Sequence, residues 1–514
     1  MRLDRFEWAA LAALLALSFA VLAGLLVRVW TKGGVVTGSD GFLVVDQLQY
    51  LNWLRQAGDS VAVENLYDLS PGPASFVHPG VVVSGLLHRL GLGLVASYAV
   101  WKPVACLALF FGARAWIARF LERRGDRRLA LVLALFTVLP VAAVVGWAGL
   151  GDNRTKFEFD FATNELWPGN WLWGYMFTAI AVGLMPLGLL AYERRRLVVA
   201  ALIGLVCAWL QPWQGITFAL VLVVAEVVQV RRGPQSVSGA LRDLVPVGAA
   251  TALPLVYYLL LSVFDSSWEL AGEANARGAI DVWPWWVAVL VLAPLAVPAA
   301  FAYRLPAPTF ADVALRVWPI AALFVFVQPF GTFPAHAFQG MLLPLVVLAL
   351  LAVRSWLGAG RRLPLWPALA MALVFVVPGT AYQVDNMRDA INGGLQAHFL
   401  RDEEHDALRF LDAAQEPGGV LAPVYSGTVV PAYTGRETWI GAGSWTPDFE
   451  ERRLASEGLF AGRVDRATAE RIVGDSGARW VLSDCHGRAG IAALLSGVTE
   501  APRRFGCATV WRVR

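Results

Sequence analysis

The chain has 514 residues, of which 57% are hydrophobic and 16% are charged, and its mean hydropathy is +0.56. Soluble domains are about 45–50% apolar and about 25% charged, so the composition excludes an ordinary soluble protein and indicates an integral membrane protein. The formal net charge of +3 says little about partners, and we expect no nucleic-acid partner.

The first apolar stretch follows MRLDRFEW and runs to about Val29. It is too long for the hydrophobic region of a signal peptide, and no small-residue cleavage site follows it. We therefore predict an uncleaved signal anchor whose N-terminus lies in the cytoplasm.

Further apolar stretches of sufficient length to cross a bilayer recur along the chain. Because short arginine-rich loops stay in the cytoplasm, ERRGDRR at 122–128 and ERRR at 193–196 fix the direction of the neighbouring spans. The result is an α-helical polytopic protein of the inner or plasma membrane, with exoplasmic loops at 30–93 and 149–171. About eleven spans are predicted, at roughly 8–29, 94–120, 129–148, 172–191, 197–211, 214–230, 244–263, 284–303, 314–331, 338–353 and 364–383.

From about Asn386 the composition becomes that of a soluble domain. DEEHDALRFLDAAQ and DRATAERIVGDSG are predicted helices, and GGVLAPV and ARWVLSD are predicted strands. We therefore divide the chain into a membrane module, 1–385, and a small α/β domain, 386–514, which an odd number of spans places outside. That compartment permits a disulfide between Cys485 and Cys507, although two free thiols are an equal alternative.

The stretch from Asp40 to Pro79 is too polar for a span and too aromatic for a plain connector. Its first part, GFLVVDQLQYLNWLRQA, has helical periodicity and is predicted to lie along the membrane surface. Asp46 and Tyr50 share one face of this helix, with Trp53 nearby. Because partial desolvation shifts the pKa of an acid at the water–lipid boundary, Asp46 is our candidate general base, with Asp40 in reserve. A purely structural acid near a helix start is the alternative.

These features resemble the GT-C superfamily of polytopic glycosyltransferases, which use polyprenyl-phosphate sugars and include protein O-mannosyltransferases and aminoarabinose transferases. DQLQYLNWLRQA resembles their acid-bearing first-loop helix, and NLYDLSPGPASFVHPG resembles the segment that leads to their His-Pro or Pro-Pro junction. WPGNWLWGYMFTAIAVGLMPLGLLA, CAWLQPWQG, FPAHAFQGMLLPLVVLA and PAYTGRETWIGAGSWTPDFEERR resemble later segments. The chain has Gln211-Pro212 where the family pattern has His-Pro. It has His336 or Gln339 where the family often has an arginine. These departures leave open whether the chain binds the lipid phosphate in the usual way.

The resemblance implies that a sugar is transferred from a polyprenyl-phosphate donor to a hydroxyl group of a glycan, lipid or protein at the exoplasmic face. Asp46 would deprotonate the acceptor opposite the leaving phosphate, which gives inversion. Tyr50, Trp53, Gln211 and Gln214 are expected to line the substrate pocket.

The departing phosphate needs polar or cationic partners, for which the candidates are Lys102, His78, Arg154, Lys156 and His336. Lys102 lies in the outer half of a span, where a charge is costly and usually functional, and snorkelling to the interface is its alternative. For His78 a structural role before a proline turn is the alternative, and for Arg154 and Lys156 a solvated position in the loop.

The second loop also carries Asp152, Glu158, Asp160 and Glu165. Paired carboxylates can bind a divalent metal, but an ordinary solvated loop is favoured, and we expect no cofactor.

Two other functions compete with the enzyme. A transporter or flippase of a lipid-linked glycan should carry ionisable groups or broken helices near mid-membrane, often in repeats. A non-catalytic scaffold for cell-envelope assembly would not need Asp46. Because charges fall mainly in loops and no internal repeat is found, the sequence favours the enzyme.

Overall fold

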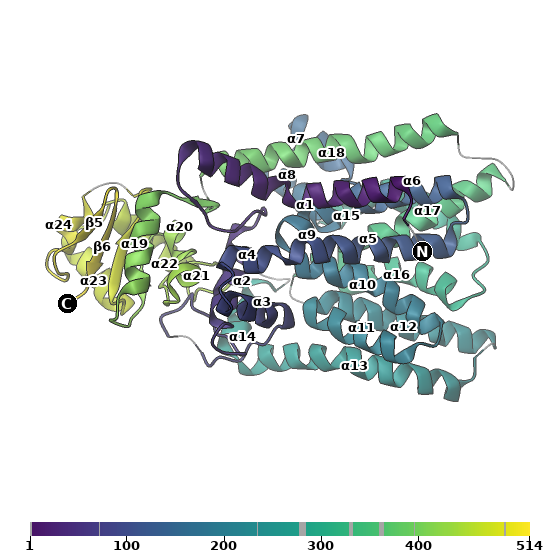
Figure 1. Cartoon of the computed structure of the whole chain (residues 1–514), viewed down its shortest axis with the longest axis horizontal. Helices are drawn as coiled ribbons and strands as arrows, with labels where there is room; N and C mark the ends of the chain where they lie inside the picture. Colours follow the sequence, from purple (N-terminus) through teal and green to yellow (C-terminus); the bar gives the residue numbers. More distant parts are fainter. Residues whose placement is uncertain are drawn as a thin grey trace. The chain divides into compact units, whose positions relative to one another are not determined.

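The computed structural model describes residues 3–70, 72–233, 235–276, 284–327, 333–358, 364–394, 396–487 and 490–514, and these are mostly helical (Figure 1). The chain forms two compact units. We call residues 1–19, 101–259 and 276–388 the helical unit, and residues 20–100, 260–275 and 389–514 the mixed unit. The break near residue 388 lies close to the predicted domain boundary. However, the whole loop 30–93, which the sequence assigned to the membrane module, groups with the C-terminal segment.

Eight helical segments of the described chain are long and apolar enough to cross a membrane. They are α1 (Arg5–Lys32), α4 and α5 (Leu94–Ala99 and Trp101–Phe120, taken together), α10 (Met176–Glu193), α12 (Pro212–Arg232), α13 (Val237–Phe264), α15 with η1 (Trp285–Phe301 and Ala302–Arg304), α16 (Phe310–Val327) and α18 (Leu365–Gly393).

A bent pair, α6 (Arg124–Phe136) and α7 (Pro140–Trp147), adds a ninth candidate, and α11 (Leu197–Leu210) and α17 (Leu342–Leu357) are shorter apolar helices. Each predicted span overlaps one of these helices or the bent pair, and residues 328–331 of the predicted span 314–331 lie outside the described residues. The prediction of a multi-pass α-helical membrane protein is therefore confirmed.

Small residues let the central helices of the helical unit approach closely. Gly112 of α5 faces Gly183 of α10, and a Cβ added to either glycine would collide with the backbone of the other helix. Close backbone contact of this kind is typical of helices packed within membranes, where van der Waals contact replaces the hydrophobic effect.

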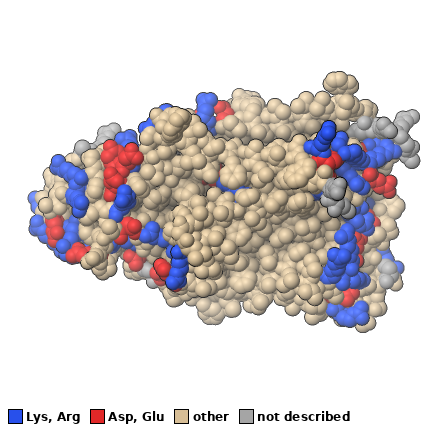
Figure 2. Space-filling model, viewed as in Figure 1, with Lys and Arg blue, Asp and Glu red and all other residues tan. Residues whose placement is uncertain are grey.

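The arginine-rich loops of the helical unit meet at one end of it, where the N-terminus lies (Figures 1 and 2). Ion pairs join them: Asp4 to Arg124 and Arg128, Arg119 to Glu193, Arg195 to Asp243, and Arg354 to Asp126. Arg124, Arg128 and Asp126 belong to the loop 122–128, and Glu193 and Arg195 belong to the loop 193–196. The sequence predicted one common side for these two loops. Which compartment that side faces stays a prediction.

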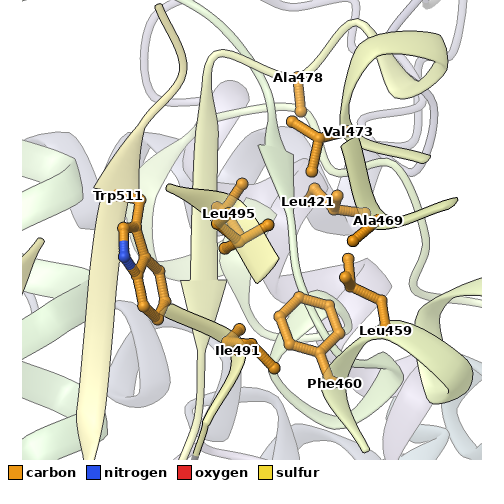
Figure 3. Close-up of a cluster of buried hydrophobic side chains, with 10 residues drawn as sticks. Leu421, Leu459, Phe460, Ala469, Val473, Ala478, Ile491, Leu495 and Trp511 are labelled. Carbon is orange, nitrogen blue, oxygen red and sulfur yellow. The ribbon is translucent and has the colours of Figure 1, made fainter. Parts of the chain in front are cut away.

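The mixed unit contains a four-stranded sheet in the order β3-β4-β6-β5, with β3 (Val420–Leu421) parallel to β4 (Trp480–Ser483). The strands β6 (Ala508–Arg512) and β5 (Arg503–Phe505) complete it in antiparallel fashion. Side chains from α22 (Phe449–Phe460), α23 (Arg466–Ser476) and α24 (Ile491–Leu495) pack with the sheet in one core (Figure 3). This confirms the predicted small α/β fold.

A disulfide joins Cys485, just after β4, to Cys507, just before β6. Of the two alternatives that the sequence left open, the structure has the disulfide.

The rest of the mixed unit ties the first loop to the C-terminal segment. The short strand β1 (Val35–Val36) pairs with β2 (Phe399–Leu400), which precedes α19 (Asp402–Ala413) and α20 (Val424–Gly427). Helix α2 (Val44–Gln56) packs against α3 (Pro79–Arg89), α4 and α21 (Val430–Thr434). Even the polar Gln47, Gln49 and Asn52 of α2 are buried, so α2 is enclosed on more sides than a helix lying on a membrane surface would be.

Candidate functional site

Asp46 lies in the first turn of α2, where a carboxylate interacts favourably with the helix dipole. Its side chain is exposed, although the three residues that follow it are all buried. Within its unit, Asp46 is thus an accessible acid on a firmly packed helix.

Tyr50, one turn further along α2, stacks on Tyr98 with 5.9 Å between the ring centroids and meets Trp53 edge-on at 5.8 Å. Burial raises the pKa of Tyr50, and the nearby Asp46 carboxylate raises it further. The same two causes raise the pKa of Tyr67. Both phenols therefore keep their protons at neutral pH, and Tyr50 lies near enough to Asp46 to feel its charge.

The reserve candidate, Asp40, is buried in the turn before α2. The side-chain oxygen of Gln47 organises this turn, because it accepts hydrogen bonds from the backbone N–H groups of Asp40 (2.7 Å) and Gly41 (3.2 Å). Its burial makes Asp40 a less accessible base than Asp46.

Trp53 belongs to an aromatic cluster drawn from four segments of the mixed unit. Its ring centroid lies 4.4 Å from that of Phe76, 5.4 Å from that of Trp445 and 6.3 Å from that of Trp268, which belongs to α14 (Ser266–Ala274). The sequence predicted Trp53 as a pocket residue but not these partners, because they are far from it along the chain.

His78 has a structural role in the mixed unit. It is buried at the N-cap of α3, where its Nδ1 accepts a hydrogen bond from the backbone N–H of Val81. An N-cap acceptor satisfies one of the free N–H groups of a helix start, which is the alternative that the sequence offered for this residue.

A second group of candidate side chains comes together in the helical unit. Helix α8 (Asn153–Leu166) ends next to η2 (Pro334–Phe338), and the Oε2 atom of Glu165 lies 3.0 Å from Nδ1 of His336. The same oxygen accepts a hydrogen bond from Nε2 of Gln339 at 2.8 Å. Gln339 in turn accepts one from Gln211 at 2.9 Å, and Gln211 also donates to Thr178.

Gln214 completes this network through its amide nitrogen, which donates to the backbone oxygen of Gln339 at 2.9 Å. Its amide oxygen is buried and has no hydrogen-bond partner among the described residues. A buried acceptor left unpaired costs free energy, so the position suits a donor from outside the chain. We call Glu165, His336, Gln339, Gln211, Gln214 and Thr178 the α8–η2 network.

The structure thus joins three predicted site residues, His336, Gln211 and Gln214, and adds Gln339, which the sequence offered only as an alternative to His336. Glu165 was noted only as part of an acidic loop. The spacing of His336 and Gln339 on one short turn was the available signal for their pairing. Nothing local in the sequence indicates that Glu165 contacts them.

Lys102 is enclosed within the helical unit, where its side chain is fully buried. Its ammonium group donates to the backbone oxygens of Leu172 (2.8 Å), Ser18 (3.0 Å) and Trp173 (3.5 Å). An ammonium has three donors, and these three carbonyls account for them. The geometry therefore favours a structural role for Lys102 over phosphate binding or snorkelling.

The acids of the second loop have separate partners. Asp152 caps α8 and is exposed, and hydrogen bonds from Thr155 lower its pKa. Glu158 pairs with Arg154 at 3.1 Å. Asp160 accepts from the hydroxyl of Tyr382 at 3.1 Å, and burial raises the pKa of Asp160 to about 6.

Among the described residues, these three carboxylates do not form a group with the spacing of metal ligands. The remaining loop cation, Lys156, is exposed, and its ammonium lies 5.9 Å from the ring centroid of Tyr382.

Comparison with solved structures gives matches over nearly the whole chain. The oligosaccharyltransferase AglB from Archaeoglobus fulgidus, in complex with an inhibitory peptide and a dolichol-phosphate, matches with a TM-score of 0.51 and 13% identity, over 94% of this chain and 70% of AglB. ArnT from Cupriavidus metallidurans, bound to undecaprenyl phosphate, matches with a TM-score of 0.51 and 13% identity, over 99% of this chain and 98% of ArnT. The mycobacterial arabinofuranosyltransferase AftD matches with a TM-score of 0.55 and 15% identity, over 100% of this chain and 40% of AftD.

All three proteins are GT-C membrane glycosyltransferases. The chain has the GT-C fold. No family model matches the sequence, and no curated protein does. At this level of identity the likeness concerns the fold, and the resemblance seen in the sequence is confirmed to that extent.

Within this GT-C fold the predicted site residues divide between the two units. Asp40, Asp46, Tyr50, Trp53 and His78 belong to the mixed unit, and Lys102, Arg154, Lys156, Gln211, Gln214 and His336 belong to the helical unit. The roles of these residues are therefore argued unit by unit.

Proposed function

We propose that this protein is a glycosyltransferase that moves a sugar from a polyprenyl-phosphate donor to a hydroxyl acceptor at the exoplasmic face of the membrane. The observation that carries the proposal is Asp46, an exposed carboxylate in the first turn of an otherwise buried helix, within the loop that follows the first span of a GT-C fold. Among proteins of similar fold, AglB was solved with dolichol-phosphate and ArnT with undecaprenyl phosphate, which supports a polyprenyl phosphate as the lipid.

The proposed chemistry needs one base. The acceptor oxygen bonds to the anomeric carbon of the sugar while the bond from that carbon to the phosphate oxygen breaks, and the bonding electrons leave with the phosphate. The acceptor proton passes to Asp46, and attack opposite the leaving group inverts the anomeric centre. The polyprenyl phosphate departs as a stable anion, so its departure requires charge stabilisation rather than a second acid.

In the helical unit, the α8–η2 network is our proposed contact for the donor phosphate. His336 can donate from its ring. The amide nitrogens of Gln211 and Gln214 already donate to Thr178, Gln339 and the backbone oxygen of His336, so these two residues hold the network in shape. Lys102 is not carried into the proposal, because backbone oxygens occupy its ammonium. Arg154 and Lys156 are exposed loop cations and remain secondary candidates.

Two observations support the exoplasmic placement. The arginine-bearing loops cluster at one end of the helical unit, as the positive-inside rule expects of cytoplasmic loops. The mixed unit carries the Cys485–Cys507 disulfide, and disulfides persist mainly in oxidising compartments.

Transfer assays with the purified full-length protein in nanodiscs test the proposal. A panel of radiolabelled polyprenyl-phosphate pentoses and hexoses would be offered with glycan, lipid and peptide acceptors. Asp46→Asn should lower the rate by about 10²–10⁴-fold, the usual contribution of a general base. Asp59→Asn, at another exposed acid just after α2, is the matched control and should retain activity.

Undiminished transfer by a folded Asp46→Asn protein would rule out this base. If no donor is turned over, proteoliposomes loaded with a fluorescent lipid-linked glycan separate the alternatives. Movement of the glycan across the bilayer would indicate a flippase, and its absence would indicate a scaffold.

A further inference from the structure

We propose that Gln49 is a substrate-contacting residue whose amide nitrogen donates a hydrogen bond to a hydroxyl oxygen of the carbohydrate that binds at Asp46. The identity of that carbohydrate, the sugar of a polyprenyl-phosphate donor or a glycan acceptor, rests on the proposed function. The orientation of the Gln49 amide rests on the hydrogen bonds of the mixed unit alone.

The orientation is set by a backbone segment next to α2. The backbone N–H of Glu64 donates to Oε1 of Gln56 at 2.9 Å, and the backbone oxygen of Glu64 accepts from Nε2 of Gln56 at 3.1 Å. Backbone groups have fixed donor and acceptor roles, whereas a side-chain amide can be placed either way round. These two bonds therefore fix which end of the Gln56 amide is the oxygen.

The amide of Gln56 passes its orientation along α2. Its Nε2 also donates to Oδ1 of Asn52 at 3.1 Å, so the nitrogen of Asn52 points the other way and donates to Oε1 of Gln49 at 3.3 Å. A reversed Gln49 would place its nitrogen against the nitrogen of Asn52, which gives two donors without an acceptor. We call Glu64, Gln56 and Asn52 the amide relay, and Nε2 of Gln49 is the donor at its end.

This donor is buried and unused within the described part of the chain. Gln49 is 2% exposed, and its Nε2 atom has no hydrogen-bond partner among the described residues. A buried donor without a partner is costly, and native proteins contain few of them. An oxygen atom from outside the chain would satisfy it.

The donor lies on the side of α2 that carries the candidate base. Asp46, Gln49 and Trp53 are spaced i, i+3 and i+7, so they share one face of the helix. The loop that carries Glu64 also carries Tyr67, whose pKa is raised by burial and by the charge of Asp46. The relay and the acid therefore adjoin the same loop, and a ligand at Asp46 lies within one helical turn of Gln49.

A hydroxyl group is the ligand chemistry that fits this arrangement. Its oxygen can accept from the neutral amide of Gln49, and its hydrogen can go to a carboxylate. A sugar carries hydroxyl groups on neighbouring carbons, so one carbohydrate can place one group at Asp46 and another at Gln49. A site that donates to a substrate hydroxyl discriminates against an analogue that lacks it. Gln49 is thus a specificity-determining residue for the proposed transfer.

Transfer and binding assays on the full-length protein in nanodiscs test the inference, with polyprenyl-phosphate pentoses and hexoses as donors and glycans as acceptors. Gln49→Met keeps the length of the side chain and removes its donor. It should raise KM for one substrate by about fivefold to tenfold, the loss of one hydrogen bond, and leave kcat nearly unchanged. The substrate whose KM rises, sugar donor or glycan acceptor, is the one that Gln49 contacts.

Analogues that each lack one hydroxyl group locate the contact. One of them should bind the wild-type protein about fivefold to tenfold more weakly than the parent compound does. Gln49→Met should bind that analogue and the parent equally, because the hydrogen bond that distinguishes them is gone.

Asn52→Leu separates a substrate contact from a structural role. It leaves polar atoms of both Gln49 and Gln56 unpaired, whereas Gln49→Met also removes a donor that is already unpaired. Asn52→Leu should therefore lower the melting temperature more than Gln49→Met does, yet raise KM less, because it keeps the Gln49 amide. Gln415→Met, at an exposed position of the mixed unit, is the matched control without effect.

A wild-type KM and undiminished discrimination between parent and analogue in folded Gln49→Met would overturn the inference. Nε2 would then hold an ordered water only. Changes of KM that follow the losses of stability in Asn52→Leu and Gln49→Met would also overturn it, since they would show a structural role. If Gln49→Met does not fold, Gln49→Glu gives the same readout, because it keeps an oxygen for Asn52 and replaces the nitrogen by a second oxygen.

Failure of the proposed function gives a different result. If the wild-type protein binds the sugar lipids but transfers none, dissociation constants take the place of KM. Weaker binding by Gln49→Met would then support the contact while the transfer is ruled out. Absence of any carbohydrate binding by the wild-type protein would overturn the proposed function and the inference with it.

Discussion

Helix α2 of the mixed unit and the α8–η2 network of the helical unit use carboxylates in opposite ways. In α2 the polar amides are buried and the acid, Asp46, is exposed. In the network the acid, Glu165, is buried among amides, and the neighbouring His336 is the partly exposed group. An exposed acid can exchange protons with a substrate, whereas a buried one acts through the residue that it orients.

The difference shows that burial distinguishes two acids that the sequence alone treats alike. Both acids lie in polar loops of a membrane protein, and the sequence listed both as ionisable groups of interest. Their partners in the folded chain decide which of them can reach a ligand. Three experiments test this distinction.

The largest effect is expected from removal of the buried acid. Glu165→Ala leaves Gln339 without its acceptor and removes the side-chain oxygen that lies 3.0 Å from Nδ1 of His336, and each hydrogen bond to a carboxylate contributes about 1.5–3 kcal/mol. Asp46→Ala should cost at most about 1 kcal/mol, the scale of the helix-dipole interaction at an exposed first-turn acid. Melting temperatures of both variants in detergent check this, and equal losses would contradict the comparison.

A smaller loss of stability is expected at Lys102, whose ammonium donates to backbone oxygens. Lys102→Met keeps the length of the side chain but removes the hydrogen bonds to the carbonyls of Ser18 and Leu172, at a cost of about 1–3 kcal/mol. The folded variant should bind undecaprenyl phosphate as tightly as the wild-type protein does. A loss of affinity without a loss of stability would return Lys102 to the list of phosphate ligands.

The smallest effect concerns Asp160, which is buried to an intermediate degree. Burial raises the pKa of Asp160 from 3.8 to about 6, so the folded state binds this proton more tightly than the unfolded state does. The stabilisation is present below about pH 4 and is lost as the pH rises through 6. Asp160→Asn should flatten the melting-temperature profile between pH 4 and pH 6. An unchanged slope would show that Asp160 titrates normally.

Hydropathy and arginine placement were sufficient to predict the helical architecture. Each predicted span has a counterpart, and the loops around Arg124, Arg195 and Arg354 meet at one end. These signals are local. A run of about 20 apolar residues predicts a span, and a basic loop beside it predicts the cytoplasmic side, whatever the fold of the rest of the chain.

The contacts of the site residues were less predictable, because they depend on segments far apart in the sequence. Glu165 and His336 are 171 residues apart, and Trp53 packs against Trp445 from the other end of the chain. Lys102 is a similar case, since its buried position follows from carbonyl groups of two other helices. An isolated sequence identifies residues that can do chemistry but not the neighbours that direct them.

The pairing of β1 with β2 cannot form until late in the synthesis of the chain. Val35 meets Leu400, and Val36 meets Phe399, across about 360 residues of intervening chain. At a synthesis rate of 5–20 residues per second, the first loop waits about 20–70 seconds before its partner strand emerges. During that time the segment bearing Asp46 lacks the C-terminal half of its unit.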